Sequence, residues 1–212
     1  MKNFPTLLLA GLVGLVPAIS GATSLGELQD QWARISYESP APLRLEAMTK
    51  LKATADGAVA AQPDSAELLI WDGIITSSVA GLKGGLGALS LAKEARALLE
   101  KAQARNPGAL NGSALTSLGA LYYQVPGWPV GFGSSEKART NLEAALRLDR
   151  DGIDPNYFYA DFLFRKGDYS GAKLAAQRAM AAPPRAGREA ADKGRRGEVQ
   201  ALMARIEAKS TG

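Results

Sequence analysis

Apolar residues recur along the chain at helical spacing, most clearly in residues 154–184. Two apolar runs in this stretch flank residues 167–169 (Gly-Asp-Tyr), which predicts two helices joined by a tight turn. Ala172 and Ala179 lie seven residues apart, on one stripe of the second helix, where a small side chain lets the partner helix approach closely. Pro184 lacks the N–H needed to continue the helix. The stretch is therefore predicted to be a helical hairpin.

The same spacing predicts two earlier hairpins. Helices are expected at 65–79 and 88–104, then from Ser113 and over 135–148. Small or apolar residues at intervals of four and three mark each second helix: Ala95, Leu99 and Ala102; Ala138, Leu142 and Ala145; Ala172, Ala176 and Ala179. Residues 65–184 are therefore predicted to form three similar hairpins. The glycine-rich residues 80–87 lack a Gly-Lys-Ser/Thr ending and follow a helix, so we expect a flexible connection or a loosened helix end and not a phosphate-binding loop.

Further helices are predicted on both sides of these hairpins. Within 23–64, helices at 24–37 (N-cap Ser24) and 43–61 form a degenerate hairpin or a cap. Residues 185–212 form a basic linker and a last helix, whose apolar face contains Val199, Leu202, Met203 and Ile206. A repeat array needs a terminal element that is apolar inside and polar outside. The predicted fold is an all-α solenoid of three to four hairpins with a C-terminal capping helix.

The middle hairpin carries an insertion of seven residues. Gly119 and Ala138 are 19 residues apart, whereas the corresponding positions in the last hairpin are 12 apart. The added loop, 125–133, contains prolines and glycines that prevent a helix. Trp128 and Phe132 make it unusually apolar. We expect this loop to fold over one end of the groove formed by the hairpins, as a lid.

Residues 1–22 have the pattern of a secretory signal peptide. Lys2 precedes an apolar run over 7–16, and small residues follow at 20–22. A membrane anchor is the alternative, but Pro17 interrupts an apolar stretch of about 15 residues where a span needs about 20. The mature protein is therefore expected to begin near Thr23, without a stable membrane span, in the periplasm or outside the cell.

Composition and charge exclude several functions. The chain has no cysteine and no histidine, which removes disulfides, thiolate metal sites and the commonest general base. No catalytic, metal-binding or cofactor-binding residue is predicted, and we expect a protein that is not an enzyme. The net charge of +4 is concentrated after Pro183, where seven basic residues face four acidic ones. This distribution does not indicate a nucleic-acid surface.

The repeats resemble tetratricopeptide (TPR) hairpins. Leu118, Gly119 and Tyr122 match the Leu-Gly and Tyr of the TPR signature. Across about 60–200, the segments 71–75, 84–89, 122–133, 154–159, 182–185 and 194–196 resemble exported bacterial TPR proteins similar to the T-component of TRAP (tripartite, periplasmic) transporters. The resemblance implies a periplasmic accessory to solute import that contacts a substrate-binding protein and its ligand. Unlike relatives anchored as lipoproteins, this chain has no cysteine.

Six residues are candidates for binding a partner or ligand: Tyr123, Trp128, Phe132, Tyr157, Asp161 and Arg165. Three of them, at 157, 161 and 165, share one helix face at four-residue steps. Asp161 and Arg165 either form an ordinary surface ion pair or belong to a binding face that points into the concave groove. In the standard TPR register, Tyr123 also lies on the groove side. The aromatic residues either form a binding surface or only pack the inserted loop.

The sequence therefore favours a non-catalytic periplasmic TPR protein that binds a protein or peptide partner in its concave groove as a scaffold or adaptor. A periplasmic solute-binding protein is one candidate partner. The alternative is a small-ligand-binding accessory of a TRAP-type solute transporter.

Overall fold

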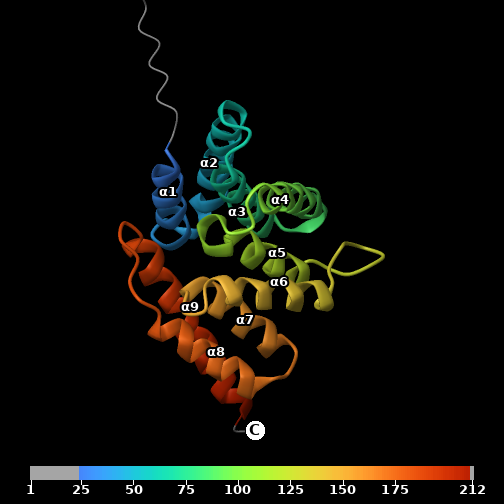
Figure 1. Cartoon of the computed structure of the whole chain (residues 1–212), viewed down its shortest axis with the longest axis vertical. Coiled ribbons are helices and arrows are strands. Elements are labelled where there is room, and N and C mark those ends of the chain that lie inside the picture. Colours follow the sequence, from blue (N-terminus) through green and yellow to red (C-terminus); the bar gives the residue numbers. More distant parts are fainter. Residues whose placement is uncertain (1–23, 211–212) are drawn as a thin grey trace, which may run out of the picture.

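The computed structural model describes residues 24–210, and the predicted signal peptide lies outside them. The described residues form a chain of helices in which neighbours in sequence pack side by side (Figure 1). In order they are α1 (Leu25–Tyr37), α2 (Ala41–Ala61), α3 (Ala66–Lys83), α4 (Gly85–Arg105), the short 3₁₀ helix η1 (Ala109–Gly112), α5 (Ser113–Gln124), α6 (Ser135–Leu148), α7 (Ile153–Arg165), α8 (Tyr169–Ala181) and α9 (Glu189–Ser210). None of the helices in this part of the chain is long and apolar enough to cross a membrane.

The helices pair as hairpins, and the hairpins stack in sequence. α3 packs on α4, α5 on α6 and α7 on α8, while α2, α4 and α6 each also contact the first helix of the next hairpin. The stack confirms the predicted all-α helical solenoid.

Small residues allow the close approach within each hairpin. Six alanines of the predicted stripes have no exposed surface: Ala95, Ala102, Ala138, Ala145, Ala172 and Ala179. A Cβ atom on Gly73 would lie 2.7 Å from Cγ of Leu99, and one on Gly119 would lie 2.6 Å from Cγ of Leu142. Each of these glycines thus accepts a leucine of the paired helix, as ridge-into-groove packing requires.

Polar side chains begin several of the helices. The Ser24 hydroxyl accepts the N–H of Glu27, and the Glu27 carboxylate accepts the N–H of Ser24 at 2.7 Å. This reciprocal capping box confirms Ser24 as the predicted N-cap. The hydroxyls of Ser65 and Ser134 and the carboxylate of Asp168 also cap helices, each by accepting one backbone N–H at the start of α3, α6 and α8, without the reciprocal bond of the capping box.

The glycine-rich connection is shorter than the sequence suggested. α3 continues through Lys83 and α4 begins at Gly85, so residues 80–87 are mostly helical. Gly84 and Gly85 have φ angles of 62° and 61°, in the left-handed region that glycine enters at little cost. Because these two residues reverse the chain at once, no long loop is needed, and the expectation that the connection extends over 80–87 is wrong.

The last helix does more than cover the final hairpin. Val199, Leu202 and Ile206 are buried, as predicted for a capping helix, and α9 packs on α7 and α8. Its first half also contacts α1, so the two ends of the solenoid meet (Figure 1). At this contact the ring of Tyr37 lies directly against the backbone of Gly194. The solenoid is therefore closed along its inner side.

Candidate functional site

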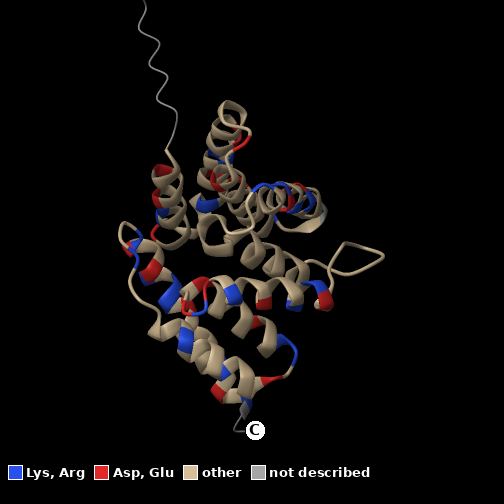
Figure 2. Ribbon diagram, in the orientation of Figure 1, with Lys and Arg blue, Asp and Glu red and all other residues tan. Residues whose placement is uncertain are grey.

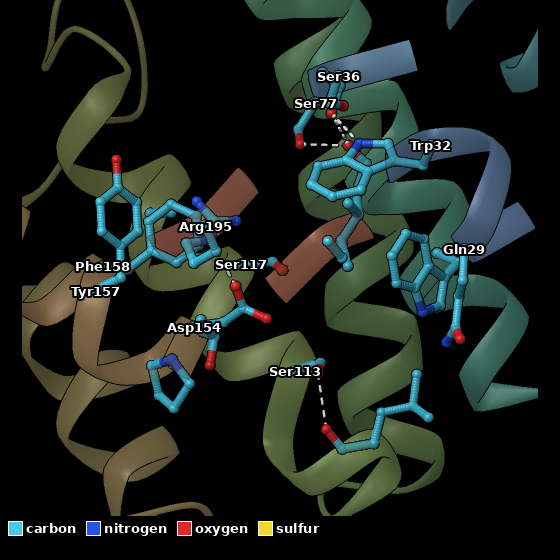
Figure 3. A pocket seen from close by; sticks show the side chains of 18 of the residues that line it. Gln29, Trp32, Ser36, Ser77, Ser113, Ser117, Asp154, Tyr157, Phe158 and Arg195 are labelled. Atoms are coloured by element: carbon cyan, nitrogen blue, oxygen red, sulfur yellow. Dashed lines mark hydrogen bonds and ion pairs between the residues drawn. The ribbon is translucent and has the colours of Figure 1, made fainter. Parts of the chain in front are cut away.

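A cavity of about 710 Å³ lies on the inner side of the solenoid. The first helices of three hairpins (α3, α5 and α7) line it, and α1 and the start of α9 also contribute residues. In the close-up, Gln29 and Trp32 come from one side, Asp154, Tyr157 and Arg195 from the other, and Ser113 and Ser117 lie between them (Figure 3). The cavity exists because α1 and α9 meet.

One side of the cavity is aromatic. The ring centroids of Trp32 and Trp71 are 5.7 Å apart, and those of Trp32 and Tyr37 are 5.8 Å apart, both edge to face. The indole N–H of Trp32 donates to the hydroxyl of Ser78 at 2.9 Å. Because this donor is satisfied within the protein, Trp32 presents mainly apolar surface to an occupant.

The opposite side is charged. Asp154 accepts hydrogen bonds from Nη1 of Arg185 and Nε of Arg195, each at 2.7 Å. Burial alone would raise the pKa of Asp154, but the two guanidinium groups outweigh it and lower the pKa to about 2. The cluster joins the segment before α9 to the start of α7, where basic and acidic residues lie next to one another (Figure 2). Asp154 therefore stays ionised and holds both arginines in place.

Arg195 is the most deeply placed of these arginines, with 8% of its surface exposed. Its guanidinium lies 4.6 Å from the ring centroid of Tyr157 and 4.8 Å from that of Phe158. It also forms an ion pair with Glu198 on its own helix. These contacts satisfy the Arg195 charge within the protein.

Arg188 is different. Its guanidinium lies 4.9 Å from the ring centroid of Trp71 and makes no hydrogen bond or ion pair with any residue in the described part of the chain. Burial, followed by repulsion from Arg185, lowers the pKa of Arg188. A half-buried cation at the cavity wall thus lacks a hydrogen-bonding partner within residues 24–210.

Five uncharged polar side chains also line the cavity without a side-chain hydrogen bond in the described part of the molecule: Gln29, Ser36, Asn111, Thr116 and Ser117. Pockets of about 300–1,000 Å³ with apolar walls and a few polar groups are typical of small-molecule sites. Within residues 24–210, no cluster of three acidic, histidine or cysteine residues is arranged to hold a metal ion. The arrangement suits binding and orienting an organic molecule.

The predicted binding residues fall in three places. Tyr157 lines the cavity beneath Arg195. Tyr123, Asp161 and Arg165 lie together: the Tyr123 hydroxyl and Nε of Arg165 both donate to Oδ2 of Asp161 at 2.9 Å. This cluster is outside the cavity lining, although Gln124, which is part of the lining, donates to the Tyr123 hydroxyl at 3.3 Å.

The inserted loop does not cover the cavity. None of residues 125–133 lines it, and the loop projects from the ends of α5 and α6 (Figure 1). Trp128 is 90% exposed, whereas the ring of Phe132 packs against Tyr122 and under the guanidinium of Arg96. The predicted lid is wrong because Gly133 donates to the carbonyl of Pro126 at 2.9 Å, which closes the loop on itself and directs its tip outward.

Sequence reasoning missed most of the cavity. The predicted basic linker and tail contained Arg185, Arg188 and Arg195, and Trp32 was assigned only to a helix. Trp71, Arg185 and Arg195 also lie in the segments that resemble the TRAP-associated proteins, but none of them was predicted to bind. A usable signal was present: Arg188, Asp192 and Arg195 follow at steps of four and three, so they share one face of a helix. Opposite charges at these steps predict ion pairs along one face of the last helix, although such a face is more often exposed to solvent than buried.

Comparisons with known proteins support the fold. No protein-family model and no curated protein matches the chain. The crystal structure of a thermophilic TPR protein from Thermus thermophilus resembles it with a TM-score of 0.55 at 19% sequence identity, covering 89% of this chain and 92% of that one. The likeness shows the fold: the chain is a TPR-like all-α helical solenoid.

Proposed function

We propose that the protein is a non-catalytic binding protein that holds a small organic molecule in the cavity between α1, α9 and the inner helices. The observation that carries this proposal is the contact of α1 with α9, which turns the inner side of the solenoid into a bounded cavity of about 710 Å³. The mixed lining supplies both apolar contact and orienting polar groups.

The size of the cavity limits what it holds. An α-helix with its side chains is about 10–12 Å wide, so several turns of helix need more than about 1,000 Å³. A long helical segment of a partner would therefore extend beyond the cavity while α1 and α9 are in contact. A short extended segment of a partner chain does fit, so it is the alternative to a free small molecule as the occupant of the cavity.

Native mass spectrometry of the protein purified from its own host tests the proposal. We expect a bound mass on the wild type that is lost when Ser117→Trp fills the cavity. Ser170→Trp, on the exposed surface of α8, is the matched control and should keep the bound mass. A bound mass retained by Ser117→Trp, or none on the wild type, contradicts the proposal.

The exposed loop favours a second candidate function, the docking of a protein partner. Its tip presents Trp128 at 90% and Val130 at 63% exposure, and residues 125–133 contain no charged side chain (Figure 2). Exposed tryptophan at a fixed loop tip suits an apolar pocket on another protein, such as a periplasmic solute-binding protein. The TPR-like fold is also that of an interaction scaffold.

Photo-crosslinking tests this candidate. A photoreactive amino acid at position 128 should give one discrete crosslinked protein, whereas the same group at Leu174, which is 60% exposed on α8, should not. Equal crosslinking from both positions contradicts docking through the loop.

An exported location and a link to a TRAP-type transporter are also proposals. The pattern of residues 1–22 supports export, and the sequence resemblance supports the transporter link. Sequencing the N-terminus of the protein from a periplasmic fraction tests export: we expect it near Thr23. A cytoplasmic protein that retains Lys2 contradicts it.

A further inference from the structure

The charges around the cavity do not all find partners. Asp154 pairs with Arg185 and Arg195, Asp192 pairs with Arg185, and Glu198 pairs with Arg195. These contacts use three carboxylates and two arginines. Within the described residues, the guanidinium of Arg188 makes a cation–π contact but no hydrogen bond or ion pair, and the charges of Asp154 and Asp192 attract it only from a longer distance.

Two other charged residues of the lining do not change this balance. Nε of Arg44 donates to the backbone carbonyl of Ser39 at 2.8 Å. Asp149 forms no ion pair with any arginine of residues 24–210; burial raises its pKa, and the charge of Arg185 opposes this shift. Neither residue supplies a partner for Arg188.

The surroundings of Arg188 favour an anion. Its guanidinium is half-buried, lies beside the aromatic side of the cavity and is repelled by Arg185. A planar guanidinium binds a carboxylate through two parallel hydrogen bonds. A carboxylate would also relieve the repulsion between the two arginines.

We propose that the cavity selects a carboxylate with an apolar body, which Arg188 binds through its guanidinium while the body lies against Trp32 and the apolar lining. This proposal rests on the small-ligand function proposed above and names the chemical class of the ligand. The carboxylate belongs either to a free small acid or to the C-terminus of a partner chain.

Matched acids and amides separate charge recognition from apolar binding. Isothermal titration compares 4-phenylbutyrate with 4-phenylbutyramide, and octanoate with octanamide. We expect the wild type to bind each acid at least about tenfold more tightly than its amide, because the amide lacks the charge that Arg188 pairs. Arg188→Gln should bring the ratio to within about twofold, because it weakens binding of the acid more than binding of the amide. Arg178→Gln, an exposed charge change on α8, should keep the wild-type ratio.

A second set of titrations identifies whether the carboxylate belongs to a free acid or to a chain terminus. Uncharged tetrapeptides ending in phenylalanine are titrated with a free and with an amidated C-terminus. A charge preference among the tetrapeptides that exceeds the preference among the small acids assigns the site to a chain terminus. A preference among the small acids alone assigns it to a free molecule.

The titrations distinguish failure of the carboxylate inference from failure of the proposed ligand-binding function. Equal binding of acids and amides by the wild type, or a preference that survives in Arg188→Gln, overturns the carboxylate inference and leaves ligand binding intact. Absence of binding by every compound, together with no bound mass on the native protein, overturns the ligand-binding function as well.

Discussion

The hydroxyl of Tyr37 donates a hydrogen bond of 3.3 Å to Oε2 of Glu198, although the two residues are 161 positions apart in the sequence. The bond joins the C-terminal end of α1 to α9, and the Tyr37 ring also packs edge to face on Trp32. Burial raises the pKa of Tyr37; Arg195 opposes this shift and the carboxylates of Glu198 and Asp154 add to it, so the hydroxyl stays protonated and able to donate. This contact closes the inner side of the solenoid.

Two glycines of α9 test the closure. A Cβ atom on Gly194 would overlap the Tyr37 ring, whereas one on Gly197 would meet nothing within 4 Å. Gly194→Ala should therefore lower the free energy of unfolding by about 1–3 kcal/mol, through overpacking. Gly197→Ala should raise it by up to about 1 kcal/mol, because alanine favours the helix. Urea unfolding of both variants measures the difference, and equal stabilities contradict the packing described here.

Gly119 and Leu142 are predicted to be coupled. Alanine at Gly119 places a methyl group against the Leu142 side chain, and we expect a loss of about 1–3 kcal/mol in the free energy of unfolding. Leu142→Ala alone should cost about 2–5 kcal/mol, because it leaves a cavity in the core. The double variant should lose less than the sum, since each change accommodates the other. Additive losses contradict direct contact.

Asp72 should make the protein less stable as the pH rises from about 4 to 6. This carboxyl group is 2% exposed and accepts one hydrogen bond, from Thr76 at 3.2 Å. Burial, together with repulsion from Asp56, raises its pKa to about 6. Because the folded state binds the proton more tightly than the unfolded state does, ionisation above this range costs about 2–3 kcal/mol.

Asp72→Asn removes that cost. We expect the variant to have a free energy of unfolding about 2 kcal/mol higher than the wild type at pH 7 and a flatter profile between about pH 4 and 6. Urea unfolding at several pH values is the measurement. Identical slopes for variant and wild type across this range contradict the buried ionisable group.

Asp154 has the opposite effect to Asp72 on how the stability of the protein depends on pH. Its lowered pKa means that the stability it contributes is present above about pH 4 and is lost as the pH falls toward about 2. Asp154→Asn should cost about 2–4 kcal/mol at pH 7, because Arg195 is left buried without its main partner. Asp30→Asn, in the exposed pair with Arg34, is the control and should change stability by less than about 1 kcal/mol. A similar loss in both variants contradicts a structural role for the Asp154 cluster.

The hairpins could be predicted because their causes are local in the sequence. Ala172 and Ala179 have no exposed surface, and α6 spans the residues expected from the spacing of Ala138, Leu142 and Ala145. Close helix packing requires small residues at these intervals, so the pattern itself carries the information.

The cavity could not be predicted in the same way, because it depends on a contact between the two ends of the described chain. Periodicity shows that α1 and α9 each have an apolar face, and it does not show that they meet. Likewise, the sequence places Arg188 and Trp71 in separate elements, and their stacking at 4.9 Å follows only from the closed fold. The direction of the Trp128 loop depends on backbone hydrogen bonds that leave no pattern in the sequence.

The most direct test of the account follows the indole N–H signals of the three tryptophans by nitrogen-15 NMR during titration with 4-phenylbutyrate. Trp32 and Trp71 line the cavity, whereas Trp128 is exposed on the inserted loop. We predict that the signals of Trp32 and Trp71 shift with a common saturation curve and that the Trp128 signal does not move. A shift confined to Trp128, or no shift of the two cavity signals, contradicts binding in the cavity.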